Sequence, residues 1–232
     1  MSLPDIRLVL FDLDGTLIDS APDLCHALNQ ALHEVGLPQP DVDAVRRMIG
    51  EGQRVLVERA LRWAGGEAAL NQTDDVLARF RRHYSAHLVE KTVLYPGVRE
   101  TLAALSPRLP LAVATNKPGE WARRIVAAFG LSEQFRWVLG EDDIGRRKPD
   151  PLLLLTLCER AGVPPSSALM VGDSAIDLAA AEAAGLRMAF CTYGFSDEAT
   201  LARVRNPAPA AALGSSARPY LCDELSALLR LL

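Results

Sequence analysis

Two aspartates, Asp12 and Asp14, stand one residue apart directly after the apolar run 6–11. Gly15 and Thr16 follow them, so the pair lies where the chain would leave a buried strand. Asp and Gly are common turn residues, and a turn alone would account for this stretch. Carboxylates beside a turn whose backbone N–H groups can meet an anion would also suit a site for phosphate and a metal ion.

Polar residues also follow two later strand-like runs. Thr115 and Asn116 come at the end of one run, and Asp173 directly follows another. Asp177 lies four residues after Asp173, about one helical turn away. Because ligands of an open parallel sheet bind outside the carboxyl ends of its strands, three strands would bring acids and a hydroxyl to the same edge.

Four carboxylates at one edge would repel each other and raise each other's pKa unless a cation compensates. An all-oxygen set favours a hard ion, Mg²⁺ before Zn²⁺ or Cu²⁺. Lys148 precedes Pro149, which is predicted to start a helix, and its ammonium could hold a phosphate there. His83 and His87 are four residues apart, but a surface pair is the expected interpretation.

The order of elements predicts an α/β fold. Short apolar runs alternate with helical patterns that end at glycine, which is typical of βαβ units and a parallel sheet. Residues 19–92 contain no strand-like run and predict three helices, the first with Ser20 as N-cap. Residues 206–219 are rich in Ala, Pro and Ser and predict a long mobile loop, and residues 222–232 predict a closing helix.

Composition excludes several classes of function. The 232 residues include 49% hydrophobic and 23% charged residues, and the net charge of −4 offers no basic field for nucleic acid or an acidic membrane. No apolar stretch reaches the roughly 20 residues that span a bilayer. The four cysteines are scattered without a C-x-x-C motif, so free thiols and a cytoplasmic location are expected.

The stretches DLDGT (12–16), Thr115, Lys148 and GDSAID (172–177) occur in this order at matching element ends. Together they resemble the four motifs of the haloacid dehalogenase-like phosphohydrolase superfamily. The resemblance implies a Rossmann-like parallel sheet core, residues 1–18 and 93–232, with an inserted α-helical cap domain, residues 19–92. Flanking stretches such as FDLDGTLIDSAPDL and RRKPDP resemble the branch that hydrolyses 2-phosphoglycolate.

The resemblance also implies roles for the motif residues. Asp12 would be the nucleophile that forms a phosphoaspartyl intermediate, and Asp14 would be the general acid and then the base. Thr115 would hydrogen-bond the phosphoryl group, and Lys148 would neutralise charge on it and on the nucleophile. Backbone N–H groups of Gly15, Thr16 and Asn116 would bind phosphoryl oxygens. Mg²⁺ would be held by side chains of Asp12, Asp173 and Asp177, the last directly or at one remove, and by the Asp14 carbonyl.

In the cap, the loop 49–54 is expected to reach the substrate through Gly50, Gly52 and Arg54. The alternative is that both glycines only shape a turn between helices and that Arg54 is solvated.

The expected function is a Mg²⁺-dependent phosphatase of a small phosphorylated metabolite, with 2-phosphoglycolate as the expected substrate. A sugar phosphate, a phosphorylated amino sugar acid and pyrophosphate are alternative substrates. A β-phosphoglucomutase-like phosphomutase and a non-catalytic binding module are alternative functions. Asp14 argues against carbon–halogen cleavage, because the relatives with that activity lack this second acid. The sequence leaves monomer and homodimer open.

Overall fold

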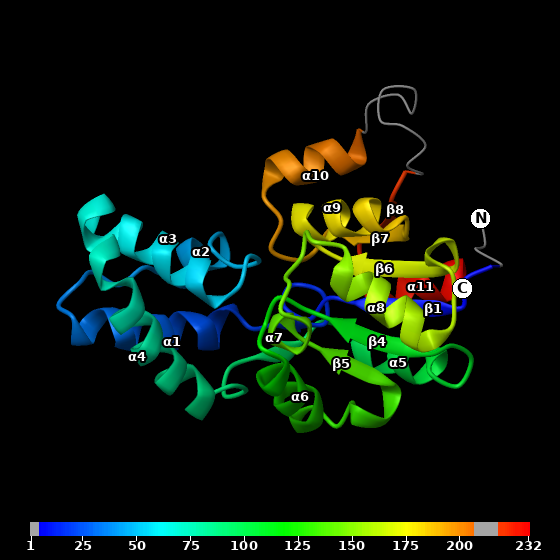
Figure 1. The fold of residues 1–232 in the computed structure, drawn as a ribbon, viewed down its shortest axis with the longest axis horizontal. Coiled ribbons are helices and arrows are strands. Elements are labelled where there is room, and N and C mark those ends of the chain that lie inside the picture. The colour runs from blue at the N-terminus through cyan, green and yellow to red at the C-terminus, as the bar shows by residue number, and fades with distance from the viewer. Residues whose placement is uncertain (1–4, 207–217) are drawn as a thin grey trace. The chain divides into compact units, whose positions relative to one another are not determined.

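A computed structural model describes residues 5–206 and 218–232 of the chain (Figure 1). The chain forms two compact units, one from Met1–Ile18 and Leu94–Leu232 and the other from Asp19–Val93. The first unit is built on a β-sheet and the second is helical. Two short strands, β2 (Ile18–Asp19) and β3 (Val93–Leu94), pair with each other where the chain passes from one unit to the other and returns.

The sheet of the first unit has the strand order β5-β4-β1-β6-β7-β8. Every neighbouring pair is parallel, which confirms the predicted α/β class with a parallel sheet. Central β1 is apolar throughout and fully buried, as expected for a strand covered on both faces. The strands are β1 (Leu8–Phe11), β4 (Leu111–Ala114), β5 (Trp137–Leu139), β6 (Ala168–Gly172), β7 (Arg187–Cys191) and β8 (Tyr220–Cys222).

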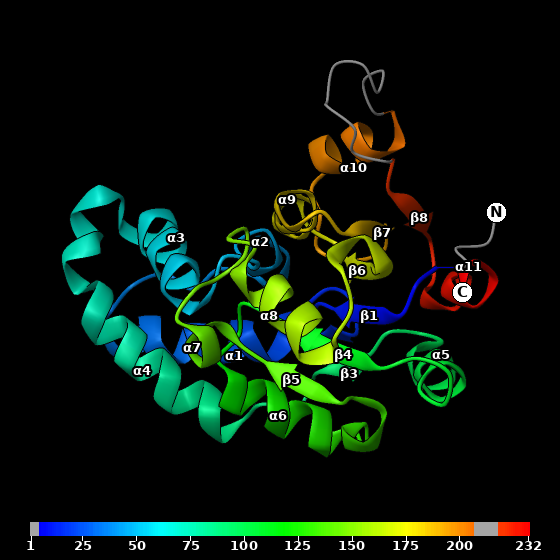
Figure 2. The same cartoon turned by 45° about the vertical axis from the view of Figure 1, so that its right-hand side comes forward.

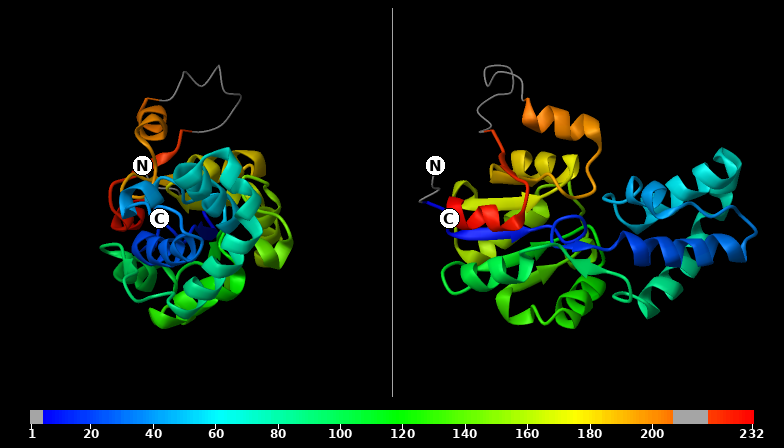
Figure 3. Two further views of the ribbon diagram at one scale, coloured as in Figure 1. Left: turned by 90° about the vertical axis from the view of Figure 1, so that its left-hand side faces the viewer. Right: turned by 180° about the vertical axis from the view of Figure 1, so that it is seen from behind.

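Helices cover both faces of this sheet (Figure 2). The α8 and α9 helices pack on one face, where Leu153, Leu157 and Ala181 join Leu8 and Leu10 in a buried core. The α5 and α11 helices lie on the opposite face, which the view from behind shows (Figure 3). The helices of this unit are α5 (Val98–Leu105), α6 (Gly119–Ala128), α7 (Glu141–Ile144), α8 (Leu152–Ala161), α9 (Ala175–Ala184), α10 (Glu198–Arg205) and α11 (Leu228–Leu231).

The C-terminal part differs from the sequence-based expectation. The predicted helix over 222–232 is wrong in extent, because Tyr220–Cys222 forms the edge strand β8 and only α11 is an α-helix after it. The α10 helix was not predicted. The loop predicted over 206–219 falls mainly on residues 207–217, which lie outside the described residues. The helix after Lys148 begins at Leu152 and not at Pro149.

The helical unit contains α1 (Ala21–Glu34), α2 (Val42–Arg46), α3 (Gln53–Gly65) and α4 (Thr73–Ala86). Ser20 is the N-cap of α1, as predicted, but its side chain makes no capping bond to the helix. Asp23, three residues after Ser20, accepts hydrogen bonds from the backbone N–H groups of Lys91 and Thr92. Asp23 therefore ties the start of α1 to the chain segment that follows α4.

At the far end of α1, Glu34 accepts hydrogen bonds from Arg79 and Arg82 of α4. These arginines lower the pKa of Glu34 to about 2, because they stabilise its ionised form. Polar contacts thus hold both ends of α1 to other parts of the helical unit. None of the described helices in either unit is both long and apolar enough to cross a membrane.

Candidate active site

Three neighbouring strands in the middle of the sheet end in polar residues. Asp12 follows β1, Thr115 follows β4 and Asp173 follows β6. Because β1 pairs in parallel with both β4 and β6, the three carboxyl ends meet at one edge. The structure thus places these predicted site residues together, as their order along the chain suggested.

An acidic cluster lies at this edge. Asp12, Asp173 and Asp177 each offer one carboxylate oxygen, and these oxygens lie within 4.8 Å of one another. Burial raises the pKa of Asp12 to about 7, although the positive charge of Lys148 opposes the rise. Burial also raises the pKa of Asp173 well above its ordinary value, and the charges of Asp177 and Asp12 add to this effect. Such a crowded all-oxygen set fits a hard divalent cation, which would offset the repulsion.

Lys148 reaches into the same cluster. Its Nζ lies 2.9 Å from Asp12 Oδ1 and 2.7 Å from Asp177 Oδ1. Burial by itself lowers the pKa of Lys148, but the two carboxylates outweigh burial and raise it above its usual range. The side chain is 1% exposed, so this ammonium remains charged among partners that exclude water.

The amide of Asn116 fixes the backbone of Lys148. Asn116 Nδ2 donates to the Lys148 carbonyl at 3.0 Å, and the Lys148 N–H donates to Asn116 Oδ1 at 2.7 Å. The sequence pointed to a backbone contribution of Asn116 and to a helix start beside Lys148. In the structure, this pair of hydrogen bonds, and not a helix N-terminus, holds the lysine in place.

Asp177 has both carboxylate oxygens engaged. Its Oδ2 accepts from the N–H and the hydroxyl of Ser174 in a capping box at the start of α9. Its Oδ1 faces Lys148 at 2.7 Å. A helix cap therefore aims this acid at the lysine and the acidic cluster.

Asp173 is held by a segment that none of the sequence motifs includes. The Thr16 hydroxyl donates to Asp173 Oδ1 at 2.9 Å, and the N–H of Phe195 donates to Oδ2 at 2.6 Å. The Tyr193 hydroxyl donates to the Thr16 carbonyl at 2.9 Å. The loop 192–196 after β7 thereby joins the site, and its position at a fourth strand end is the signal that could have indicated it.

Glycine is required at two positions around Asp173. Gly15 has φ +86°, and a Cβ there would overlap the Asp173 carboxylate. A Cβ at Gly194 would overlap the same carboxylate and the Gly15 carbonyl oxygen. The two backbones therefore approach Asp173 more closely than any other residue type would allow.

Asp14 lies outside the three-acid cluster and has a different cation. Lys117 Nζ is 3.1 Å from Asp14 Oδ2, and both side chains are largely buried. The Lys117 N–H donates to Thr115 Oγ1 at 3.2 Å. Lys117 is a second buried cation at this edge, and the sequence analysis assigns it no role.

The predicted cap residues all belong to the helical unit. Gly50 and Gly52 lie between α2 and α3, and Gly52 is the N-cap of α3. Arg54, half exposed, forms an ion pair with Asp74 and lies 3.6 Å from Glu58. Within this unit, Arg54 therefore has carboxylate partners.

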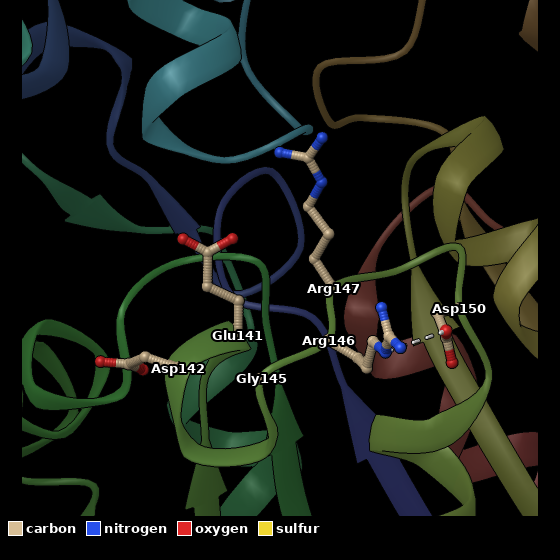
Figure 4. Close-up of a pocket in the computed structure, with 6 residues that line it drawn as sticks. All are labelled: Glu141, Asp142, Gly145, Arg146, Arg147 and Asp150. Atoms are coloured by element: carbon tan, nitrogen blue, oxygen red, sulfur yellow. Dashed lines mark ion pairs between the residues drawn. The ribbon is translucent and has the colours of Figure 1, made fainter. Parts of the chain in front are cut away.

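A pocket of about 490 Å³ lies beside the chain segment that leads to Lys148 (Figure 4). Figure 4 shows Glu141 and Arg147 pointing to the same side, while Arg146 turns toward Asp150 at 4.0 Å. The lining mixes acids and arginines and includes none of the acidic cluster. The lining of this pocket is therefore distinct from the three-acid cluster. Its lining residues are Glu141, Asp142, Gly145, Arg146, Arg147 and Asp150.

Comparison with known proteins identifies the family. The family model described as haloacid dehalogenase-like hydrolase matches residues 9–191. The phosphoglycolate phosphatase of Pseudomonas putida KT2440 is 44% identical over 195 residues, which cover 82% of this chain and 71% of that protein. The phosphoglycolate phosphatase of Escherichia coli K12 is 41% identical, with 83% of each chain covered.

A solved structure agrees with these relatives. It is described as a predicted phosphoglycolate phosphatase from Haemophilus somnus 129PT, and it matches with a TM-score of 0.84 and 35% identity over 97% of each chain. These matches confirm the resemblance that the four motifs suggested. The chain belongs to the haloacid dehalogenase-like hydrolases, and among them to the phosphatases that these relatives represent.

Proposed function

We propose that this chain is a Mg²⁺-dependent phosphatase whose substrate is 2-phosphoglycolate. The observation that carries the chemistry is the buried Asp12 carboxylate, held 2.9 Å from the Lys148 ammonium at the edge of a three-acid cluster. The relatives named phosphoglycolate phosphatase, at 41–44% identity, support the substrate.

Asp12 is the nucleophile of this proposal. Its carboxylate oxygen forms a bond to phosphorus while the ester P–O bond breaks, and Asp14 gives its proton to the departing alkoxide oxygen. A water molecule then attacks the phosphoaspartyl phosphorus, Asp14 takes the proton of that water, and the P–O bond to Asp12 breaks. Orthophosphate and the alcohol are the products, and both aspartates return to their starting states.

The groups around Asp12 assist both displacements. Lys148 offsets negative charge on Asp12 and on the phosphoryl group, and Asn116 keeps the lysine in place through its two hydrogen bonds. The Thr115 hydroxyl orients a phosphoryl oxygen. The N–H of Gly15 donates to the Ile18 carbonyl at 2.9 Å and the N–H of Thr16 to the Leu13 carbonyl at 3.4 Å, so a phosphoryl oxygen would have to share these two donors with the turn.

The donor set favours Mg²⁺ as the metal. Asp12, Asp173 and Asp177 would hold it together with the Asp14 backbone carbonyl, and Asp177 could act at one remove because Lys148 and Ser174 engage its oxygens. When bound, Mg²⁺ supplies positive charge that neutralises the carboxylates and the phosphoryl oxygens.

The helical unit completes the proposal as a cap over small substrates. Its support is that a separately compact unit is inserted directly after the first motif. We assign the substrate-facing role to Gly50, Gly52 and Arg54, and exclusion of water to the unit as a whole. We also propose action in the cytoplasm, supported by four buried cysteines that are all free thiols.

A panel of small phosphorylated metabolites tests this function. Phosphate release is measured with Mg²⁺ for 2-phosphoglycolate, sugar phosphates, a phosphorylated amino sugar acid and pyrophosphate. The proposal predicts the highest kcat/KM for 2-phosphoglycolate and no release after addition of a chelator. A preference for another member would reject the substrate. Turnover that requires a sugar bisphosphate would reject hydrolysis in favour of a mutase.

A further inference from the structure

We infer that Lys117 is a positioning residue for proton transfer, because its ammonium holds Oδ2 of Asp14 and so orients the carboxyl group, whose other oxygen carries the proton, toward the leaving oxygen. The inference rests on the proposed phosphatase function. It adds a residue to that function, since none of the four motifs that carry the family resemblance includes Lys117.

The geometry places Lys117 beside Asp14. Its Nζ lies 3.1 Å from Asp14 Oδ2, and the two side chains are 4% and 13% exposed. The Lys117 N–H also donates to Thr115 Oγ1, so the backbone of the lysine is fastened to the end of β4. A short, largely buried ion pair of this kind restricts the rotation of both partners.

The two buried lysines of the site contact different carboxylates. Lys148 contacts Asp12 and Asp177, which belong to the three-acid cluster. Lys117 contacts Asp14, whose side chain is not part of that cluster. The carboxylate proposed to move protons is thus paired apart from the carboxylates proposed to hold the metal.

The choice of residue type supports a dedicated role. Among 25 basic residues the chain has three lysines, Lys91, Lys117 and Lys148, and the rest are arginines. As whole residues, Lys117 and Lys148 are 6% and 2% exposed, and both contact carboxylates at this edge. An ammonium is a compact point charge, whereas a guanidinium is a wide planar fork, so lysine is the cation that suits a confined site beside a single carboxylate oxygen.

Leaving-group dependence tests the inference. An alkoxide must be protonated as it departs, but 4-nitrophenolate leaves without a proton. We therefore compare kcat/KM, which reports the steps up to phosphoenzyme formation, for 2-phosphoglycolate, glycerol phosphate and 4-nitrophenyl phosphate. Lys117→Met should lower the value for both alkyl phosphates by about 100-fold, the lower range of general acid catalysis, and the value for 4-nitrophenyl phosphate far less. Asp14→Asn should show the same selective loss.

Two further variants keep the test decisive. Lys117→Gln retains a donor of hydrogen bonds and should lie between wild type and Lys117→Met, with thermal unfolding used to verify that each variant is folded. Lys91→Met removes the lysine outside this site and should leave the ratio of alkyl to aryl activity unchanged.

Three results would overturn the inference. Equal losses on all three substrates would show that Lys117 serves the phosphoryl group or the fold. A loss confined to 2-phosphoglycolate, with glycerol phosphate spared, would show that Lys117 binds the substrate carboxylate. Absence of turnover by the wild-type protein on every ester would overturn the proposed function itself, and the inference with it.

Discussion

The carboxylates of the candidate site differ in the groups that hold them. Asp12 and Asp177 share the ammonium of Lys148, whereas Asp173 accepts hydrogen bonds from the Thr16 hydroxyl and the Phe195 N–H. With Asp14 and Lys117 included, four acids face two lysines. Without a metal, the site therefore carries excess negative charge, which burial makes costly.

This charge excess predicts an opposite effect of Asp12→Asn on activity and on stability. The variant should lose phosphatase activity, yet the metal-free protein should become more stable near pH 7.5. The pKa of Asp12 is about 7 in the folded protein against an ordinary value of 3.8, so the folded protein binds this proton more tightly than the unfolded chain. The free energy of unfolding of the wild type should therefore fall as pH rises from about 4 to about 7.

Urea unfolding of metal-free wild type and Asp12→Asn across this pH range checks the prediction. The difference in the free energy of unfolding between the two proteins should grow with pH and exceed about 1 kcal/mol at pH 7.5. One unit of pKa shift corresponds to about 1.4 kcal/mol, so this threshold requires only part of the shift. A difference that stays constant between pH 4 and pH 7.5, or a less stable Asn variant, would contradict it.

At this scale, the sequence located residues that follow strands but not their side-chain partners. Asp12, Thr115 and Asp173 could be placed because parallel strands bring their carboxyl ends together. Lys117 and Tyr193 could not, because a contact such as Lys117 to Asp14 depends on side-chain direction across two loops. The hydrogen bonds between Asn116 and Lys148 could not be predicted from the sequence for the same reason.

Among the elements, the loop 192–196 after β7 supports the site most closely. Phe195 donates its N–H to the Asp173 side chain, and Ser196 donates its hydroxyl to the Asp173 carbonyl. Tyr193 reaches the turn at Thr16. The loop after β7 thus connects the loops after β1 and β6, and it fixes the direction of a proposed metal ligand.

Gly194→Ala should therefore weaken Mg²⁺ binding. The added Cβ would overlap Asp173 and the Gly15 carbonyl oxygen, so the loop must move away and lose its hydrogen bonds to Asp173. Loss of such supporting contacts lowers metal affinity by about 10–100-fold, which isothermal titration calorimetry with Mg²⁺ measures.

Gly185→Ala is the matched control for this substitution. Gly185 ends α9 with φ +72° and has no atom near the position of an added Cβ. It should lower stability through backbone strain while leaving Mg²⁺ affinity intact. Equal affinities for the Gly194 and Gly185 variants would contradict the proposed support of Asp173.

Long and strongly patterned elements were predictable, and short ones at the edge of the sheet were not. The runs that form β1, β4 and β6 are continuous and apolar, and β7 is apolar after Arg187, which is the pattern of buried parallel strands. Edge strand β8 has only three residues, Tyr220–Cys222, and so lacks a pattern of its own. The α10 helix packs on the core only through buried Val204 and partly buried Leu201, and so has too small an apolar face to indicate it.

At the scale of the whole molecule, the acidic cluster lies in only one of the two units. Asp12, Asp173 and Asp177 all belong to the unit built on the sheet, and the helical unit contributes none of the three. Mg²⁺ binding should therefore stabilise the sheet unit directly. A ligand present at 100 times its dissociation constant stabilises a folded state by about 2.7 kcal/mol.

Hydrogen exchange with and without Mg²⁺ tests this difference. Exchange of backbone amides in β1, β6 and α9 should slow in Mg²⁺, because opening these elements would release the ion. Amides in α3, within the helical unit, should exchange at rates set by their own packing and change little. Protection that rises equally in both units, or only in α3, would contradict a metal site confined to the sheet unit.

Family and fold class were predictable because four motifs occur in the order of the family and three of them stand at strand ends, and the family match over residues 9–191 confirms this. The identity of the substrate is less accessible from sequence. In the proposed function it depends on Gly50, Gly52 and Arg54 of the helical unit, and Arg54 has carboxylate partners within that unit that spacing does not indicate.

Trapping the phosphoenzyme tests the central claim most directly. The protein is mixed with 2-phosphoglycolate carrying a radioactive phosphoryl group and Mg²⁺, quenched with acid within one turnover, digested and mapped by mass spectrometry. The account predicts label on the peptide that contains Asp12, dependent on Mg²⁺ and absent from Asp12→Asn. Turnover of the substrate with no bound label, or with label on another residue, would contradict the account.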